Sequence, residues 1–590
     1  TIYDTSESKS IVKTILGKRG ISQKEIHPSE ILQYIDSVKN LGHYLGCKVP
    51  ETINEIDQDD LFFDFYKEFE GELHKSNAVD FGGLITGVLN LLETFPEVLE
   101  RYQKRFHYVL VDEYQDTNRA QFRLVKLLSD LRKNICVVGD EDQSIYSWRG
   151  ADIRNILDFE TVFPNAKLIK LEQNYRSSKN IIEAASCVIS KNINRKGKEL
   201  WTDNDRGDSI EVIECPDDRS EADFTANEVE RLISQNVDPK DIAIFYRQNA
   251  QSRMIEDSLR KLNIPYRVVA GVKFYERKEI KDLLSYLRCI VNDKDSLALS
   301  RVINTPVRGI GARTLRKIED EAIKYDLSLW EMLGKLTDNY DDYKHLRLNT
   351  KVKKGIANFV NLIHEAKILE KNKSEPSVIY EKILNESGYL ESLEVEKTYE
   401  SLGRIENLEE LMSAIKQYEE DEEAPSIVGF LETITLDESK ISEEEKQAEV
   451  SMMTIHGSKG LEYLYVFVVG LEENVFPSFQ SMDGGEEAIE EERRLFYVAM
   501  TRAMTKLYLL FAQSRMLWGS LRFNSGSRFL DEIPEEYYKW KSLKPKSRTS
   551  NSKSYAQNNT FDEFSQVNDY EFDGETTFVR ESSAKMEYKF

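Results

Sequence analysis

The sequence predicts an α/β protein built on open parallel sheets. Two short apolar runs, 107–112 and 134–139, each end in polar residues, and a helical pattern lies between them at 118–131. A strand, a helix and a strand in that order are typical of a parallel sheet, where ligands bind at the carboxyl ends of the strands. Further strand-like runs predict a second sheet of the same kind: 242–246, 465–470 and 507–512.

Two helical regions accompany these sheets. Residues 1–77 carry apolar side chains at helical spacing, such as Ile31 and Ile35. Residues 282–449 are charged and poor in strand signals, and strand-like sequence flanks them on both sides. This pattern predicts a helical domain inserted into the second α/β domain. From residue 541 the chain becomes rich in Ser, Asn and Lys, which predicts a flexible tail.

The charge of the chain is unevenly distributed. Asp and Glu outnumber Lys and Arg by 104 to 80, giving a net charge of −24, which taken alone argues against a nucleic-acid partner. Half of that charge falls in 405–450, with fifteen acids and three Lys, and a second acidic run spans Asp483–Glu492. We expect both to be solvated faces. In contrast, 301–317 has five basic residues and no acid, so local charge still permits DNA binding.

Composition excludes other classes of protein. No apolar run approaches the ~20 residues of a membrane helix, and the polar N-terminus lacks the features of a signal peptide. Five dispersed cysteines form no C-x-x-C pair and seven histidines are scattered, so we expect free thiols in a reducing cytosol and no zinc site. The expected location is therefore cytoplasmic, with no membrane partner.

The first predicted strand ends in two adjacent carboxylates, Asp112 and Glu113. One carboxylate can hold Mg²⁺ while the other accepts a proton from an attacking water. The second strand leads to Gln143, whose neutral amide can contact a terminal phosphate or orient water. A bare Asp-Glu pair is more often a solvated loop, but this pair lies in a ten-residue block, 109–118, that matches a known pattern.

Aromatic and basic residues follow Gln143 in a loop that contains glycine. Tyr146, Trp148 and Arg149 stand close together in the sequence. Stacking of a nucleic-acid base on an aromatic side chain contributes about 1–3 kcal/mol and tolerates any base sequence. A core tryptophan is the alternative, but the neighbouring Arg149 and Gly150 favour an exposed platform.

Two arginines from distant segments are candidates for contacts with a nucleotide. Arg176 follows Tyr175, whose ring can stack on adenine, and Arg502 lies far along the chain in the second α/β region. Each guanidinium can neutralise charge on a transferring phosphoryl group, from opposite sides of a cleft. Alone, either arginine would more often form a surface ion pair.

Two loops punctuated by glycine complete the candidate set. In 454–462, Glu462 can bind a ribose hydroxyl, and His456 and Lys459 can contact phosphate or a nucleic-acid strand; a lone histidine is usually structural, so His456 is included for its setting. In 304–315, glycines can free backbone N–H groups for phosphate and arginines add charge. The residues concerned in that second loop are Arg308, Gly309, Gly311 and Arg313. An ordinary connection between helices is the alternative there.

These blocks resemble, in their order and in their residues, the later motifs of superfamily 1 DNA helicases of the UvrD/PcrA type. The match spans roughly residues 80–530, and several blocks run eight to thirteen residues. The resemblance implies two RecA-like motor domains with helical insertions, which enclose ATP and Mg²⁺. It further implies 3′→5′ translocation on single-stranded DNA with unwinding of duplex.

The resemblance also implies roles for individual residues. Those serving Mg²⁺, the attacking water or the γ-phosphate would be Asp112, Glu113, Gln143, Arg176 and Arg502. Tyr175 would meet adenine and Glu462 the ribose. Those near the DNA strand would be Trp148, Arg149, Tyr146, Arg247, Asn249, His456 and Lys459. Those touching duplex backbone would be Arg308, Gly309, Gly311 and Arg313.

Mapped onto this family, the chain divides into five expected parts. They are 1–77, the helical insertion of the first motor domain; 78–180, the C-terminal part of that domain; 181–281 with 450–540, the second motor domain; 282–449, its helical insertion; and 541–590, the tail. The implied partners are single-stranded DNA and junctions of single- and double-stranded DNA, in a bacterial, nucleoid-associated setting. Repair proteins or RNA polymerase are candidate partners of the tail, and the sequence leaves repair and replication open.

One family element is absent from the sequence. No segment fits G-x-x-x-x-G-K-[ST], the loop that cradles the β/γ-phosphates, and the family's first DNA-contacting motifs are missing too. We expect that an N-terminal piece is missing and that this chain alone hydrolyses ATP poorly. The alternative is a DNA- or polymerase-binding accessory protein that does not hydrolyse ATP.

Overall fold

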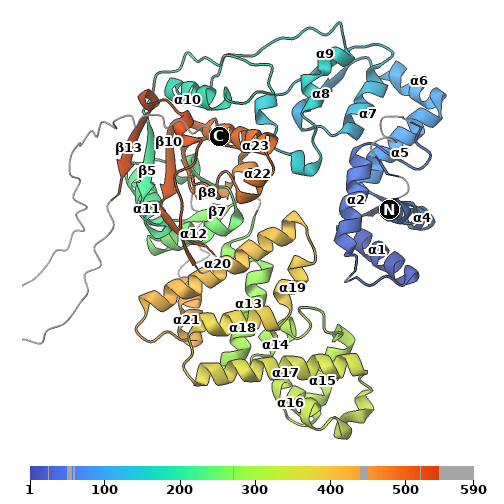
Figure 1. Cartoon of the computed structure of the whole chain (residues 1–590), viewed down its shortest axis with the longest axis vertical. Coiled ribbons are helices and arrows are strands. Elements are labelled where there is room, and N and C mark those ends of the chain that lie inside the picture. Colours follow the sequence, from blue (N-terminus) through green and yellow to red (C-terminus); the bar gives the residue numbers. More distant parts are fainter. Residues whose placement is uncertain are drawn as a thin grey trace, which may run out of the picture. The chain divides into compact units, whose positions relative to one another are not determined.

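The computed structural model describes residues 1–23, 25–48, 56–57, 60–269, 271–438, 449–517 and 520–543. Within these ranges the chain forms α/β regions and separate groups of helices (Figure 1). The predicted mixed α/β class is therefore confirmed. No helix in these ranges is both long and apolar enough to cross a bilayer. The predicted tail, from residue 544 onward, lies outside the described residues.

The N-terminal region is mainly helical, as predicted. Its helices share a buried core that includes Val12, Phe65 and Phe69. The bounds of these helices are α1 (Thr5–Arg19), α2 (Pro28–Asn40) and α4 (Leu61–Lys75). The helical prediction missed one feature, because β1 (Ile2–Tyr3) pairs in parallel with β2 (Val79–Asp80). This pair ties the start of the chain to the segment that leads into the first α/β region.

The first α/β region has the predicted strand, helix, strand order. β3 (Val109–Val111) and β4 (Ile135–Val137) pair in parallel, and α7 (Arg119–Ser129) connects them. Asn118 caps α7 through a reciprocal capping box with Gln121, which explains why the helix begins there. The other elements of this region are α5 (Phe81–Thr94), α6 (Pro96–Arg105), η1 (Tyr114–Asp116), η2 (Glu141–Gln143), η3 (Ser147–Arg149), α8 (Arg154–Leu157) and α9 (Phe159–Val162).

The second α/β region is built on a seven-stranded sheet whose paired strands are all parallel. Its order is β13-β5-β10-β9-β6-β8-β7. The bounds are β5 (Ile210–Cys215), β6 (Ile242–Tyr246), β7 (Tyr266–Val268), β8 (Val450–Thr454), β9 (Tyr463–Val468), β10 (Ala503–Ala512) and β13 (Tyr538–Ser542). Three of these strands, β6, β9 and β10, were predicted from the sequence. β13 crosses the predicted start of the tail at residue 541 and pairs with β5 through Ser542.

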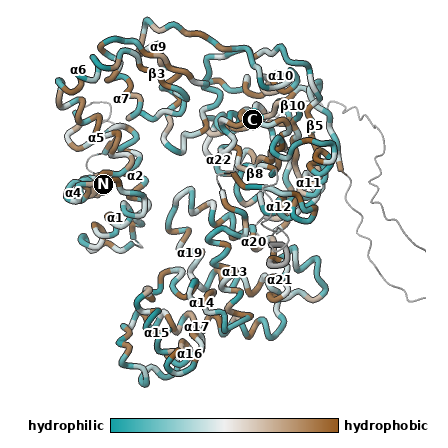
Figure 2. Tube along the Cα trace, turned by 180° about the vertical axis from the view of Figure 1, so that it is seen from behind, coloured by the Kyte–Doolittle hydropathy of each residue, from teal (hydrophilic) through white to brown (hydrophobic). Residues whose placement is uncertain are grey.

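Helices cover both faces of this sheet. α10 (Lys179–Ile189) and α23 (Glu486–Met500) pack on one face, whereas α11 (Asp218–Ser234) and α12 (Ser252–Lys261) pack on the other. Successive strand residues point to opposite faces, so Val212 joins one core and Ile213 the other. Figure 2 shows hydrophobic colour in the strands around β8 and β10. Burial on both faces is what a parallel sheet requires.

A long helical insertion leaves this sheet after β7 and returns to it at β8, its neighbouring strand. The insertion begins near α13, slightly before the predicted residue 282, and Phe274 already belongs to its core. Its helices are α13 (Lys278–Val291), α14 (Ser296–Val302), α15 (Ala312–Lys324), α16 (Leu329–Asp338), α17 (Thr350–Lys371), α18 (Pro376–Glu386), α19 (Tyr389–Glu394), α20 (Tyr399–Asp421) and α21 (Ile427–Glu438).

Candidate functional site

The predicted pair of metal-binding carboxylates lies at the carboxyl end of β3. Glu113 adopts a left-handed φ of 49°, which turns the chain sharply after the strand. Its Oε2 accepts a hydrogen bond from Gln115 Nε2 at 2.6 Å, and Asp112 Oδ1 accepts one from Glu113 N at 2.9 Å. Buried Gln115 also accepts a bond from Asp140 N at 3.0 Å. Gln115 thus ties the end of β3 to the end of β4.

Asp112 and Glu113 fit the way proteins hold Mg²⁺. In the part of the chain that the structure describes, no group of three or more His, Cys, Asp or Glu side chains is placed to hold a metal. Mg²⁺, however, is usually bound by one or two carboxylates together with water and substrate phosphates. Both residues are exposed, so their oxygens remain open for that mode of binding.

Gln143, Arg176 and Arg502 come from three distant segments and meet in one place. Arg502 Nη2 donates to Gln143 Oε1 at 3.4 Å, and Arg176 Nη1 donates to the carbonyl oxygen of Thr501, also at 3.4 Å. Gln143 Nε2 donates in turn to Asp140 Oδ2 at 2.7 Å. The loop after β4 is therefore joined to the segments that precede α10 and β10.

Arg502 is buried, and no carboxylate of the described residues is its hydrogen-bond partner. The residue is 3% exposed. Its guanidinium donates to neutral oxygens of Val498, Leu461, Thr501 and Gln143. Burial and, next, the positive charge of Arg176 lower the pKa of Arg502 to about 10. A phosphoryl anion placed here would relieve both effects, so the site fits a nucleotide phosphate.

The groups predicted to bind adenine and ribose lie beside these arginines. Arg176 Nε donates to Glu462 Oε2 at 2.7 Å. Tyr175 is 77% exposed, and its hydroxyl donates to Gln173 Oε1 at 2.7 Å. A ring fixed by its hydroxyl and open on its surface is suited to stacking.

Lys459 lies beside the acidic groups of Asp116 and Glu113, although it was expected near a DNA strand. Its Nζ donates to the carbonyl oxygen of Gln143 at 2.7 Å and to Asp116 Oδ2 at 2.5 Å, and lies 3.5 Å from Glu113 Oε2. Burial raises the pKa of Asp116, and the ammonium opposes that rise. Lys459 follows η8 (Ile455–Ser458), so this contact links the second sheet region to the carboxylate loop.

The residues predicted to stack on DNA form an aromatic cluster. The ring of His456 lies 6.3 Å from the ring of Trp148 and 6.3 Å from that of Tyr146. The guanidinium carbon of Arg149 lies 4.6 Å from the centre of the Trp148 ring. Trp148 is 43% exposed, which agrees with a platform and not with a core tryptophan. Tyr399 of α20, which the sequence did not single out, lies 6.0 Å from Trp148.

His456 is neutral at physiological pH. Burial, followed by the charges of Arg247 and Arg149, lowers its pKa to about 3. Tyr146 OH donates to the carbonyl oxygen of His456 at 3.2 Å, which couples the η8 loop to the cluster. The imidazole can pack or hydrogen-bond but adds no positive charge for a phosphate.

Arg247 and Asn249 differ in how far they are available to a ligand. Arg247 Nη2 donates to Glu492 Oε1 at 2.7 Å, and its Nε donates to the same carboxylate at 3.1 Å. Asn249 is exposed. Glu490 and Glu492 are both buried, so the prediction that Asp483–Glu492 is a solvated face was wrong for these two residues. They are retained inside because arginines pair with them.

The residues of the turn at 304–315 that were predicted to contact the DNA backbone differ in conformation and exposure. Gly309 has a φ of 83°, which requires glycine, whereas Gly311 is an ordinary N-cap of α15 with a φ of −69°. Asn304 Oδ1 fixes the turn by accepting from the backbone N–H of Arg308 at 2.9 Å. Arg313 is exposed in the first turn of α15.

Arg308 does not fit its predicted role. Its guanidinium donates to backbone carbonyl oxygens, among them that of Ser387 at 3.1 Å, and to Tyr286 OH at 2.7 Å. These bonds occupy the side chain inside the helical insertion. We therefore remove Arg308 from the proposed DNA-contacting set and assign it to holding the turn.

Comparisons with known proteins place the chain among DNA helicases. Residues 1–164 match the model of the UvrD/REP helicase N-terminal domain, and residues 169–514 match that of the UvrD-like helicase C-terminal domain. An ATP-dependent DNA helicase PcrA of Staphylococcus aureus strain MRSA252 is 42% identical over 572 residues, covering 95% of this chain and 76% of the relative. A PcrA of Staphylococcus epidermidis strain RP62A is 44% identical over 542 residues, covering 91% and 72%.

Proposed function

Because the chain belongs to the UvrD/PcrA-type family of ATP-dependent DNA helicases, we propose that it translocates 3′→5′ on single-stranded DNA and unwinds duplex at junctions. One observation carries this proposal: residues from both α/β regions meet in one candidate nucleotide site. Arg502 contacts Gln143, and Lys459 contacts Asp116. Such an arrangement lets a nucleotide control how two halves of a motor close.

In this site each side chain has a chemical task. Tyr175 stacks on adenine and Glu462 accepts a hydrogen bond from ribose. Arg176 and Arg502 neutralise the charge that builds on the phosphoryl group during transfer. Asp112 would hold Mg²⁺, which when bound neutralises phosphate charge, and Glu113 takes a proton from the attacking water.

A short stretch of chain connects the candidate nucleotide site to the proposed DNA platform at Trp148. Gln143 and Trp148 belong to the consecutive short helices η2 and η3, and Tyr146 between them bonds to the η8 loop. A shift of Gln143 toward Arg502 therefore moves the platform relative to His456. Trp148 and Arg149 grip the strand, while the exposed N-terminus of α15, with Gly309, Gly311 and Arg313, meets duplex phosphates.

We propose the domain division expected from the sequence with two adjustments. We assign 1–77 to the helical insertion of the first motor domain and 78–180 to the C-terminal part of that domain. The second motor domain comprises 181–277 with 450–543, since α13 begins at Lys278 and β13 ends at Ser542. Residues 278–449 form its helical insertion. A bacterial cytoplasmic role in DNA repair or replication follows from the family.

The sequence contains no G-x-x-x-x-G-K-[ST] loop, so we propose that this chain by itself hydrolyses ATP slowly. Arg176 and Arg502 would still meet the phosphates, but no lysine and hydroxyl of that loop grip them. Joining the family's phosphate-binding segment to the N-terminus, to give what we term the extended chain, should restore hydrolysis.

The direction of movement is tested by unwinding. Two labelled duplexes carry a single-stranded tail at the 3′ or at the 5′ end of the loading strand. The extended chain with ATP and Mg²⁺ should release the labelled strand from the 3′-tailed duplex and leave the 5′-tailed one intact. Unwinding of the 5′-tailed duplex alone would reverse the proposed polarity. Binding to both duplexes without any ATP hydrolysis would favour the accessory-protein alternative.

A further inference from the structure

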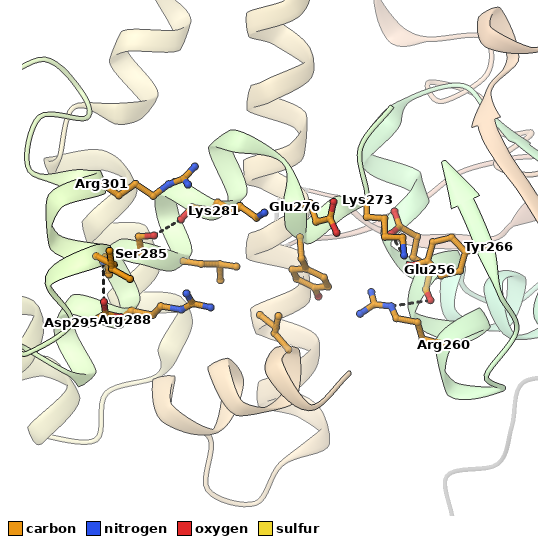
Figure 3. Close-up of a pocket in the computed structure, with 15 residues that line it drawn as sticks. Glu256, Arg260, Tyr266, Lys273, Glu276, Lys281, Ser285, Arg288, Asp295 and Arg301 are labelled. Carbon is orange, nitrogen blue, oxygen red and sulfur yellow. Dashed lines mark hydrogen bonds between the residues drawn. The ribbon is translucent and has the colours of Figure 1, made fainter. Parts of the chain in front are cut away.

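A cavity of about 800 Å³ lies at the junction of the helical insertion and the second α/β region (Figure 3). Residues of α12, β7 and η6 (Phe274–Glu276) line one side, and residues of α13 and α14 line the other. Its lining shares no residue with the candidate site described above. The cavity therefore needs an explanation of its own.

The sequence places one face of α13 against this cavity. Lys281, Leu284, Ser285 and Arg288 recur at the three- and four-residue spacing of one helix face. Figure 3 shows Lys281 and Arg288 extending from this helix toward the open space, with Arg260 on the other side. Basic side chains thus approach the same space from two parts of the fold.

The lining is basic in a chain that is strongly acidic overall. Three carboxylates line the cavity. The cationic side chains that line it are five: Arg260, Lys273, Lys281, Arg288 and Arg301. Arg260 pairs with Asp257, and Arg301 pairs with Asp282. The other three cations make no ion pair with any residue that the structure describes. Lys273 Nζ lies 5.1 Å above the ring of Tyr266, an aromatic contact that leaves its charge uncompensated.

Two of the three lining carboxylates, Glu256 and Asp295, accept hydrogen bonds from neutral groups of the fold and form no ion pair with the unpaired cations of the lining. Buried Glu256 accepts hydrogen bonds from Tyr266 OH at 3.0 Å and from Phe274 N at 3.2 Å. Asp295 Oδ1 accepts from Ala298 N at 2.9 Å and caps α14. Glu276 is exposed and forms no ion pair with a described residue, so Lys273, Lys281 and Arg288 have no carboxylate within ion-pair distance among the described residues.

We propose that this cavity binds a multiply phosphorylated anion of nucleotide size. Its volume falls in the range of about 300–1,000 Å³ typical of small-molecule sites. Ammonium and guanidinium groups without carboxylate partners are the donors that phosphate oxygens require. Such a ligand would contact α13 together with β7 and α12, and so join the helical insertion to the sheet that carries it.

Binding of inorganic tripolyphosphate to the 590-residue protein tests this proposal by calorimetry. The double variant Lys273→Ala, Lys281→Ala removes two of the unpaired cations. Loss of charge-assisted hydrogen bonds should weaken binding by at least about tenfold. The matched control, Lys240→Ala with Lys371→Ala, removes two exposed lysines outside the cavity, one from each part of the fold, and should bind like the parent.

Hydrogen exchange locates the ligand independently of affinity. Tripolyphosphate should slow exchange of backbone amides in 273–301 of the parent protein, and this protection should disappear in the cavity variant. Equal affinity in parent and cavity variant, absence of binding to the parent, or protection confined to other segments would each overturn the proposal. If only duplex DNA, and not tripolyphosphate, bound more weakly to the cavity variant, the cavity would be a DNA-backbone contact instead. Circular dichroism of each variant establishes that it folds.

Discussion

Arg502 is the residue on which the proposed chemistry depends most. It is buried, and its hydrogen bonds to described residues go to neutral oxygens. Burial and, next, the charge of Arg176 lower its pKa to about 10. Burial of a guanidinium without an anionic partner costs free energy, and binding of an anion offsets that cost. Charge developing on a phosphoryl group would therefore interact with it strongly.

Changing Arg502 to Ala should lower the kcat for ATP hydrolysis by about 10³-fold in the extended chain, as expected for an arginine that stabilises a phosphoryl-transfer transition state. Steady-state hydrolysis at saturating DNA measures this. The control is Arg528→Ala, because Arg528 forms a partly exposed ion pair with Glu473 at 2.7 Å. A near-normal rate for Arg502→Ala would refute its role.

Trp148 provides the matching test on the DNA side. Its replacement by Ala should weaken binding of a labelled oligothymidine by about 1–3 kcal/mol, because one base loses its stacking surface. Fluorescence anisotropy at fixed salt measures the affinity. Trp540→Ala is the control, since Trp540 is exposed on β13 to a similar extent, 47% against 43%. Equal losses in the two variants would contradict a specific platform.

At the scale of elements, α20 anchors the helical insertion to the second α/β region. Gln248 Nε2 donates to Glu406 Oε1 at 2.8 Å, and Arg253 Nε donates to Glu410 Oε1 at 2.5 Å. Burial raises the pKa of Glu406 to about 7, although Arg247 opposes the rise. The folded protein therefore holds a proton at Glu406 that the unfolded chain releases near pH 4.5.

This raised pKa makes stability depend on pH in a defined direction. Between pH 4.5 and 7 the folded state binds more protons at Glu406 than the unfolded state, so this group lowers the free energy of unfolding as pH rises. Glu406→Gln should remove that fall and should stabilise the protein at pH 8. Urea midpoints at pH 5 and pH 8 measure the effect, with exposed Glu432→Gln as control. Parallel pH profiles for Glu406→Gln and the parent would contradict it.

The elements also show which features the sequence could predict. β6 was predicted because a strand buried on both faces forms a continuous apolar run. β3 and β4 were predicted from apolar runs too, although their central residues, Leu110 and Cys136, are exposed. β13 was missed because it is an edge strand, Tyr-Lys-Trp-Lys-Ser, whose pairing with β5 rests on backbone hydrogen bonds that no side-chain pattern reports. Our reassignment of Arg308 could not come from the sequence, which reveals a charge but not the carbonyl oxygens that fold around it.

At the scale of the whole molecule, the candidate site exists only through long-range contacts. Lys459 and Asp116 are 343 residues apart in sequence, and Arg502 and Gln143 are 359 apart. Motif resemblance indicated that these segments act together. It did not indicate that Lys459 would join the carboxylates, or that Gln115 would bridge two strand ends, because both depend on packing between segments.

The 590-residue chain offers a prediction about separable functions. Without the phosphate-cradling loop it should bind single-stranded DNA through the Trp148 platform yet hydrolyse ATP slowly even when DNA is saturating. Parallel measurements of DNA affinity and phosphate release check this. Rapid hydrolysis by this chain would show that its own residues suffice to grip the phosphates.

The most direct test of the account is the rate of ATP hydrolysis by the extended chain with and without single-stranded DNA. We predict strong stimulation by DNA and its loss in Glu113→Gln, which keeps the size of the side chain but cannot take a proton from water. An extended chain that folds and binds DNA but releases no phosphate above background would contradict the assignment of this chain as an ATP-driven motor.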